Sequence, residues 1–188
     1  WEKDTLRDQI GVVHGLAWTA VGGVTLKIEV NVMPGKGGIQ ITGSLGDVMK
    51  ESAQAAISYI RSQSKKYKIK NDFFEKHDIH IHIPEGAVPK DGPSAGITMT
   101  TAVLSAITGH KVYGNLAMTG EVTIRGDVLQ IGGLKEKLLA AKRLGITKVL
   151  VPKMNEKDVK EFEEEVIEGL EIVYVKTMTQ VIKEAFVH

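Results

Sequence analysis

No cysteine occurs among the 188 residues of this chain. Structural disulfides, thiolate metal sites and a cysteine nucleophile are therefore excluded. An enzyme with this sequence needs an oxygen or nitrogen nucleophile instead. The absence fits a reducing compartment, so we expect a cytoplasmic protein.

Long apolar runs and an excess of one charge are absent too. No window approaches the roughly 18 apolar residues of a membrane span, and the N-terminal WEKDTLRDQIG has no signal-peptide hydrophobic region. Lys and Arg total 24 against 23 Asp and Glu, so no polyanionic partner is implied. We expect one soluble domain over residues 1–188, without membrane association. Because the chain starts at Trp1 without an initiator Met, we interpret it as cut from a longer protein.

Hydrophobic periodicity predicts both strands and helices. Alternation predicts a hairpin over Ile10–Val32 that turns at Gly22–Gly23, and strands at Ile39–Thr42, His77–Pro84, Lys148–Val151 and Glu171–Val175. Spacing by three and four predicts helices over Gly46–Lys66, Ser94–Thr108, Leu134–Leu144 and Met178–Phe186, and a charged helix from about Asn155. The expected fold class is α/β, with a β-hairpin region near the N-terminus and helices packed on mixed sheets.

One serine stands between a proline-containing turn and an apolar helix, in VPKDGPSAGITM at 88–99. Its GPSAG fits the nucleophile elbow of α/β-hydrolases, which requires a strand that runs directly into the serine and a later acid and histidine. Here a loop with three prolines precedes Ser94, and the only later histidines are His110 and His188. The elbow interpretation therefore fails.

Two interpretations of Ser94 remain. Asp91 is a reasonable N-cap and Pro93 suits a first helical turn, so Ser94 could simply cap or pack. Alternatively, unpaired N–H groups at the helix start could hold an oxyanion while Ser94 attacks, which requires a base to take its proton. This stretch leaves both interpretations open.

The predicted helix over Leu134–Leu144 offers such a base. Lys137 is the one charged residue of this helix on its apolar face, since the others fall on the opposite side. A lysine there either extends its amine to solvent or is desolvated, and desolvation lowers its pKa. A desolvated lysine is a usable general base, and Ser-Lys is a known variant of the serine-hydrolase solution.

Three other patterns favour structural interpretations. SQSK at 62–65 fits S-x-x-K, but neither S-D-N nor K-T-G follows. KKYKIK at 65–70 could contact nucleic acid, yet lysines after a helix oppose its dipole favourably. His80 and His82 share one face of a strand without an evident third ligand. We therefore expect no metal site and no nucleic-acid partner.

Four segments together resemble the proteolytic domain of Lon, the ATP-dependent protease, in its A type. They are GLAWTAVGG at 15–23, HIHIPEGAVPKD at 80–91, PKDGPSAG at 89–96 and MTGEVTIRGDVLQIGGLKEKLLAAKRLG at 118–145. The similarity runs from Ile10 to the C-terminus and implies the Lon proteolytic-domain fold. One departure is Ala20, where many A-type members carry a polar or acidic residue.

The resemblance implies a serine endopeptidase with an acyl-enzyme intermediate, in which Ser94 is the nucleophile and Lys137 the general base. It implies that Thr119 helps to hold the lysine amine, and that Asp91 and His82 lie near the site. Backbone N–H groups at Gly92 and Ser94 would stabilise the tetrahedral oxyanion.

The chain contains no G-x-x-x-x-G-K-[ST] motif, so it cannot itself couple ATP hydrolysis to unfolding. The resemblance implies that ATP and Mg²⁺ bind in an ATPase part outside this chain, and we expect no cofactor in the domain itself. It further implies unfolded polypeptides as substrates, a role in protein quality control and a hexameric ring. The alternative is a Lon-like fold used as a non-catalytic oligomerisation or binding module, against which the presence of both Ser94 and Lys137 argues.

Overall fold

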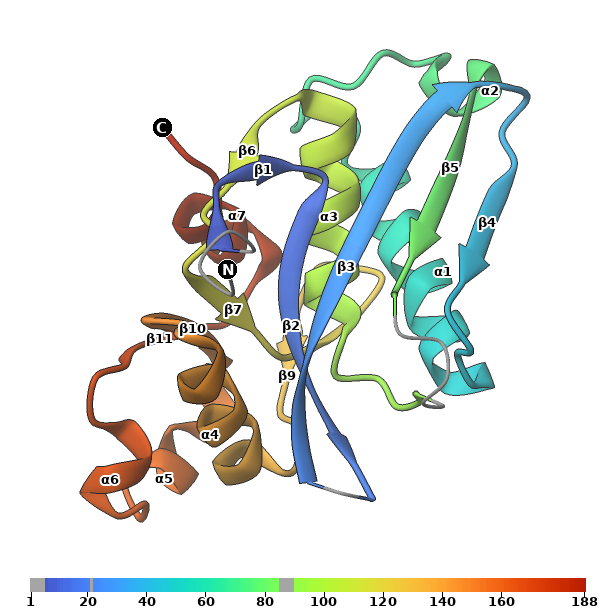
Figure 1. Cartoon of the computed structure of the whole chain (residues 1–188). Coiled ribbons are helices and arrows are strands. Elements are labelled where there is room, and N and C mark those ends of the chain that lie inside the picture. The colour runs from blue at the N-terminus through green and yellow to red at the C-terminus, as the bar shows by residue number, and fades with distance from the viewer. Residues whose placement is uncertain (1–5, 21, 85–89) are drawn as a thin grey trace.

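The computed structural model describes residues 6–20, 22–84 and 90–188. In these residues, seven strands form one mixed sheet in the order β11-β10-β7-β2-β3-β5-β4 (Figure 1). Their bounds are β2 Val12–Thr19, β3 Gly22–Pro34, β4 Ile39–Thr42, β5 His77–His82, β7 Leu116–Met118, β10 Lys148–Pro152 and β11 Glu171–Val175. Two small ladders accompany it: β1 Gln9–Ile10 with β6 Lys111–Val112, and β8 Glu121–Val122 with β9 Val128–Leu129. The predicted α/β class with a mixed sheet is confirmed.

Helices cover both faces of this sheet. They are α1 Asp47–Ser62, α2 Phe73–Lys76, α3 Gly96–Thr108, α4 Leu134–Leu144, α5 Glu156–Val159, α6 Glu164–Ile167 and α7 Met178–Ala185, with a 3₁₀ turn, η2, at Lys153–Asn155. The charged helix expected from about Asn155 is thus two short helices, α5 and α6, because the chain leaves helical geometry between them. Residues 85–89, which include part of the predicted proline loop, lie outside the described residues.

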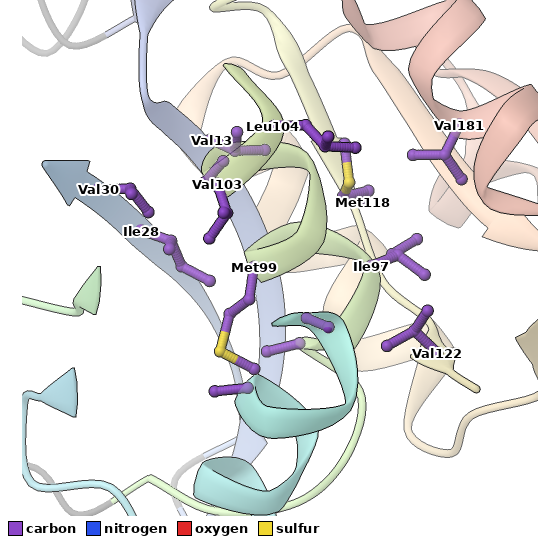
Figure 2. Packing of buried hydrophobic residues seen from close by; sticks show 14 of the residues in the cluster. Val13, Ile28, Val30, Ile97, Met99, Val103, Leu104, Met118, Val122 and Val181 are labelled. Atoms are coloured by element: carbon purple, nitrogen blue, oxygen red, sulfur yellow. The ribbon is translucent and has the colours of Figure 1, made fainter. Parts of the chain in front are cut away.

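Strand β2 separates two cores because its side chains alternate between the faces of the sheet. Val13 and Ala17 join a core with α1 and α3, whereas Leu16 joins a second core with α4. Figure 2 shows the first core, where Val13 of β2 and Ile28 of β3 lie against Met99 and Val103 of α3. The two central strands thereby fix α3 and α4 on opposite faces of one sheet.

The hairpin of β2 and β3 differs from its prediction in one respect. Gly22 and Gly23 do not form the turn but pair with Thr19 and Trp18 as the first residues of β3. A Cβ on Gly23 would lie 2.1 Å from the carbonyl oxygen of Glu136 in α4. Glycine is required here because α4 passes directly over the strand.

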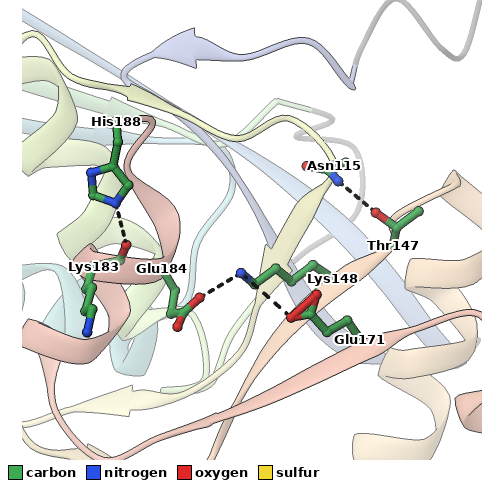
Figure 3. A network of polar contacts seen from close by, with 7 residues as sticks. All are labelled: Asn115, Thr147, Lys148, Glu171, Lys183, Glu184 and His188. Atoms are coloured by element: carbon green, nitrogen blue, oxygen red, sulfur yellow. Dashed lines mark hydrogen bonds and ion pairs between the residues drawn. The ribbon is translucent and has the colours of Figure 1, made fainter.

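The parallel strands of the C-terminal half are joined by polar contacts at their edge (Figure 3). Lys148 Nζ of β10 lies 2.7 Å from Glu184 Oε2 of α7 and 3.9 Å from Glu171 Oε2 of β11. The Asn115 amide, just before β7, donates a 2.8 Å hydrogen bond to Thr147 Oγ1. These partly exposed contacts connect β10 with α7 and β11, and the residue before β7 with the residue before β10. They lie outside the cavity described below.

Candidate active site

The amine of Lys137 is buried where α4 crosses the sheet. Its side chain is 2% exposed, and Nζ donates a 3.3 Å hydrogen bond to Oγ1 of Thr119, which is itself fully buried. No salt bridge to Lys137 occurs among the described residues. Burial without a compensating carboxylate disfavours the ammonium and lowers the pKa of Lys137 from 10.5 to about 8. The alternative in which this lysine extends its amine to solvent is excluded.

Thr119 reaches Lys137 because it directly follows β7. Its N–H donates to the carbonyl of Leu150 in the neighbouring strand β10, at 3.2 Å. The backbone of Thr119 is therefore anchored to the sheet, and its hydroxyl has a fixed position beneath α4. This arrangement orients the lysine amine by a group that is neither mobile nor charged.

Ser94 lies in a turn before α3 rather than in the helix. The prediction of a helix from Ser94 was wrong by two residues, because α3 begins at Gly96. The N–H of Gly96 bonds to the Pro93 carbonyl at 3.2 Å, and the N–H of Ile97 bonds to the Gly120 carbonyl at 3.1 Å. The first amides of α3 are thus already paired, whereas no acceptor in the described residues pairs with the N–H of Ser94.

A second contact holds the serine turn beside the lysine. The Ser94 carbonyl accepts a 2.8 Å hydrogen bond from the N–H of Gly120, the residue after Thr119. The side chain of Thr119 therefore contacts Lys137, and the backbone N–H of the next residue, Gly120, contacts the serine turn. The Ser94 and Lys137 elements are joined through this one short connection.

Ser94 and Lys137 line the same open cavity of about 510 Å³. Asp91, Gly92 and Pro93 form the wall that carries the serine, and Trp18 and residues 130–132 form the remaining lining. The structure contains no hydrogen bond between Ser94 Oγ and Lys137 Nζ, and the amine is bonded to Thr119 instead. Both groups therefore face one cavity, each held by backbone or side-chain contacts of residues 119 and 120.

Asp91 has a different role from the one expected at the start of the serine helix. Its Oδ1 accepts a 2.9 Å hydrogen bond from the N–H of Met49, in the first turn of α1. Backbone N–H groups of Met49, Gly92 and Val48 lower the pKa of the Asp91 carboxyl. The N-cap interpretation for α3 was wrong, because α3 has no side-chain cap and the carboxylate caps α1.

Gly92, between Asp91 and Pro93, has φ = +106°, which only glycine adopts without strain. Its N–H contributes to the lowered pKa of Asp91, so that amide faces the carboxylate. Of the two expected oxyanion donors, the Ser94 N–H is thus without an acceptor among the described residues and the Gly92 N–H is engaged.

His82 does not line the cavity that contains Ser94 and Lys137. It lies on β5, where Thr42 Oγ1 is 2.6 Å from His82 Nδ1 and 2.8 Å from His80 Nε2. Both histidines line a separate cavity of about 270 Å³ with Glu29 and Asn31. No group of three or more metal-ligating side chains occurs in the described residues.

Several lining residues were not predicted from the sequence. Trp18 is 57% exposed although it lies one residue before the end of the largely buried strand β2, and its ring lies against Gly133 at the start of α4. Gln130, Ile131 and Gly132 form the wall before α4. The exposure of Trp18 cannot be read from the sequence, and nothing in residues 130–132 distinguishes them from an ordinary loop.

The other motifs lie away from this cavity. Ser62 ends α1 and donates to the carbonyl of Tyr59 at 2.7 Å, and Lys66 Nζ hydrogen-bonds to Thr179 Oγ1. Among the described residues, no helix combines the length and the apolar character needed to cross a membrane.

Comparison with known proteins connects this geometry to one family. The model of the Lon protease (S16) C-terminal proteolytic domain matches residues 1–188. The Lon protease of Lachnoclostridium phytofermentans is 66% identical over 181 residues, which are 96% of this chain and 22% of that protein. That of Clostridioides difficile is 64% identical over 177 residues, 94% of this chain and 22% of its own length. Lon protease 1 of Bacillus subtilis is 59% identical over 180 residues, 96% of this chain and 23% of its own. The chain therefore spans under a quarter of these relatives.

Proposed function

Since this chain belongs to the Lon protease (S16) C-terminal proteolytic domain family, we propose that it is a serine endopeptidase domain in which Ser94 and Lys137 form a catalytic dyad. The observation that carries the proposal is a buried lysine amine, with a pKa lowered to about 8 and no carboxylate partner among the described residues, in the cavity that Ser94 lines. An ordinary lysine would be protonated at neutral pH and could not accept a proton. With a pKa of about 8, about a tenth of the Lys137 amine is neutral at pH 7 and can accept a proton.

In the proposed reaction, Lys137 Nζ takes the proton of Ser94 Oγ as that oxygen attacks the scissile carbonyl. Thr119 accepts one amine N–H, which leaves the lone pair free to face the serine. The N–H of Ser94, joined by that of Gly92 once it turns from Asp91, stabilises the oxyanion. Lys137 then protonates the leaving amine, and water releases the acyl group from Ser94 by the same base.

The wider setting is part of the same proposal. The chain carries no P-loop motif, so ATP and Mg²⁺ would act in an ATPase part of a longer protein. Unfolded polypeptides would be the substrates, within a cytoplasmic homo-oligomeric, hexameric ring that serves protein quality control. Asp91 would act on the site through the serine turn, and His82 would act from the separate cavity that it lines with His80.

Hydrolysis of an unstructured fluorogenic peptide without ATP tests the proposal. The chain should cleave the peptide at concentrations that favour assembly, and Ser94→Ala should abolish cleavage with little change in the free energy of unfolding. Ser64→Ala is the matched control, because Ser64 is a half-buried serine just after α1 that does not line the cavity. Cleavage that persists in Ser94→Ala refutes the nucleophile, and a chain that binds peptide but never cleaves it supports the non-catalytic module.

A further inference from the structure

The buried side-chain amide of Asn155 hydrogen-bonds to the backbone of Ile131, which lines the cavity of Ser94 and Lys137. Asn155 is 2% exposed, and its Oδ1 accepts from the N–H of Ile131 at 3.0 Å. Its Nδ2 donates to the carbonyl of the same residue at 2.9 Å, and to Asp158 Oδ2 at 2.8 Å. The Asp158 carboxylate can only accept, so it fixes which end of the amide is the nitrogen. One side chain thus bonds to both backbone groups of Ile131, as a neighbouring β-strand would.

This pattern sets the direction of the adjacent backbone groups. The N–H and C=O of Ile131 must lie on one side of the chain to reach a single amide, as they do in extended backbone. The corresponding groups of Gln130 and Gly132 then point to the opposite side. No hydrogen-bond partner for either residue's backbone is present in the described parts of the chain. Both residues are exposed, and both line the cavity of Ser94 and Lys137, whereas Asn155 does not.

We propose that residues 130–132 are the strand on which an extended substrate peptide is held by backbone hydrogen bonds, and that Asn155 is the positioning residue that presents this strand. The inference rests on the proposed peptidase function, because it takes a polypeptide as the ligand. Backbone pairing is independent of side-chain sequence, so it suits an enzyme that cleaves many unfolded chains. A cavity open to solvent and lined on one side by free amides accommodates such a strand.

Hydrogen exchange of single amides reads out this pairing directly. In the Ser94→Ala chain, which cannot cleave, saturation with an unstructured fluorescein-labelled peptide should slow exchange of the Gln130 and Gly132 amides. The Ile131 amide should already exchange slowly in the free chain, because Asn155 holds it. Peptide binding that leaves the exchange at both positions unchanged, or no detectable binding, overturns the proposal.

Asn155→Asp in the Ser94→Ala background tests the positioning role. The substitution keeps the shape but places an oxygen against the Ile131 carbonyl and the Asp158 carboxylate, which both accept. We expect peptide binding about tenfold weaker and faster exchange of the Ile131 amide. The matched control is Asn115→Asp, because Asn115 is an exposed amide that bonds to Thr147 outside the cavity (Figure 3). Equal binding by the two variants contradicts the role of Asn155.

A second pair of variants leaves Asn155 intact. Gly132→Pro removes the amide hydrogen that the peptide would use, whereas Gly132→Ala keeps it. A Cβ at Gly132 would meet no atom within 4 Å, so the alanine variant fits without a clash. Binding should fall about tenfold for proline and stay unchanged for alanine. Similar binding by both overturns the strand pairing. All these variants are measured in the Ser94→Ala chain, so the results depend on peptide binding and not on cleavage. If cleavage assays show that the proposed dyad is wrong, the binding results still test the strand pairing independently.

Discussion

At the scale of single residues, the burial of Lys137 lowers the pKa of its amine and also lowers the stability of the folded chain. The pKa of this lysine is about 8 in the folded chain and 10.5 when exposed. Below pH 8 the folded chain must bury a proton that the unfolded chain holds without penalty. The difference corresponds to about 3 kcal/mol at neutral pH. The hydrogen bond to Thr119 offsets part of this cost. A partly neutral amine near pH 7 is what the proposed mechanism requires of its base.

Lys137→Met should therefore abolish peptide cleavage and still stabilise the chain. The variant removes the penalty of about 3 kcal/mol but leaves the buried Thr119 hydroxyl without its partner, which costs about 1 to 2 kcal/mol. We expect a net rise of about 1 kcal/mol in the free energy of unfolding at pH 7. The rise should shrink as pH increases from 8 toward 10.5 and become a loss of about 1 to 2 kcal/mol above 10.5, where the lysine is neutral in both states. Urea unfolding at several pH values measures it.

Lys135→Met is the control on the same helix. Lys135 is partly exposed and lies 3.3 Å from Glu163, a surface ion pair, so its loss should change stability by less than about 0.5 kcal/mol. If Lys137→Met instead lowers stability at pH 7, then the amine is charged and favourably solvated in the folded chain, and it is not the proposed base.

At the scale of elements, the serine turn and α1 are joined by Asp91. Its carboxylate caps the first turn of α1 while its own backbone leads into Gly92 and Ser94. The carboxylate therefore ties the position of Ser94, the proposed nucleophile, to a helix distant in sequence. If the serine turn moves toward Lys137, the Asp91 side chain must either rotate to keep its hydrogen bond with the Met49 N–H or lose that bond.

Asp91→Ala should lower the melting temperature by a few degrees, because the N–H of Met49 loses its acceptor. Asp91→Asn should restore most of the loss, since an amide oxygen caps a helix about as well as a carboxylate. Thermal unfolding followed by circular dichroism gives both values. Equal melting temperatures for the alanine variant and the unmodified chain would show that the cap contributes nothing.

The sequence was most informative where an element carries a strong period. The bounds of α4, β4 and β11 were predicted as observed, and the apolar face of α4 identified Lys137 as the odd charge. The start of α3 was misplaced because Asp91, which looks like a local cap, bonds to α1 instead. The wall at residues 130–132 and its support by Asn155 could not be predicted, since both depend on contacts between elements far apart in the chain.

At the scale of the whole molecule, two buried bases make stability depend on pH in the same direction. Lys137 lies between α4 and the sheet, and His14 lies in the central strand β2 with 5% exposure. Burial, with the nearby Lys27 ammonium, lowers the pKa of His14 from 6.5 to about 4. Both groups bind protons more readily in the unfolded chain, so the fold is favoured at alkaline rather than acidic pH.

His14→Gln should flatten the acid side of the stability curve. The unfolded chain takes up a proton at this position as pH falls below 6.5, whereas the folded chain does so only near pH 4. The unmodified chain should lose about 3 kcal/mol from this residue between those values, and the variant should not. His188→Gln, at the exposed C-terminus, should keep the full loss. Parallel curves for His14→Gln and the unmodified chain would contradict the burial of a neutral imidazole.

The most direct test of the central claim is an NMR titration of the lysine side chains in this chain and in Lys137→Met. One lysine should titrate near pH 8, below the ordinary lysine value of 10.5, and its signal should be missing from the variant. Peptide cleavage by the unmodified chain should rise with pH along the same midpoint, because the neutral amine is the base. If no lysine titrates near pH 8, the buried amine is not available as a base, and the Ser94–Lys137 mechanism is wrong for this protein.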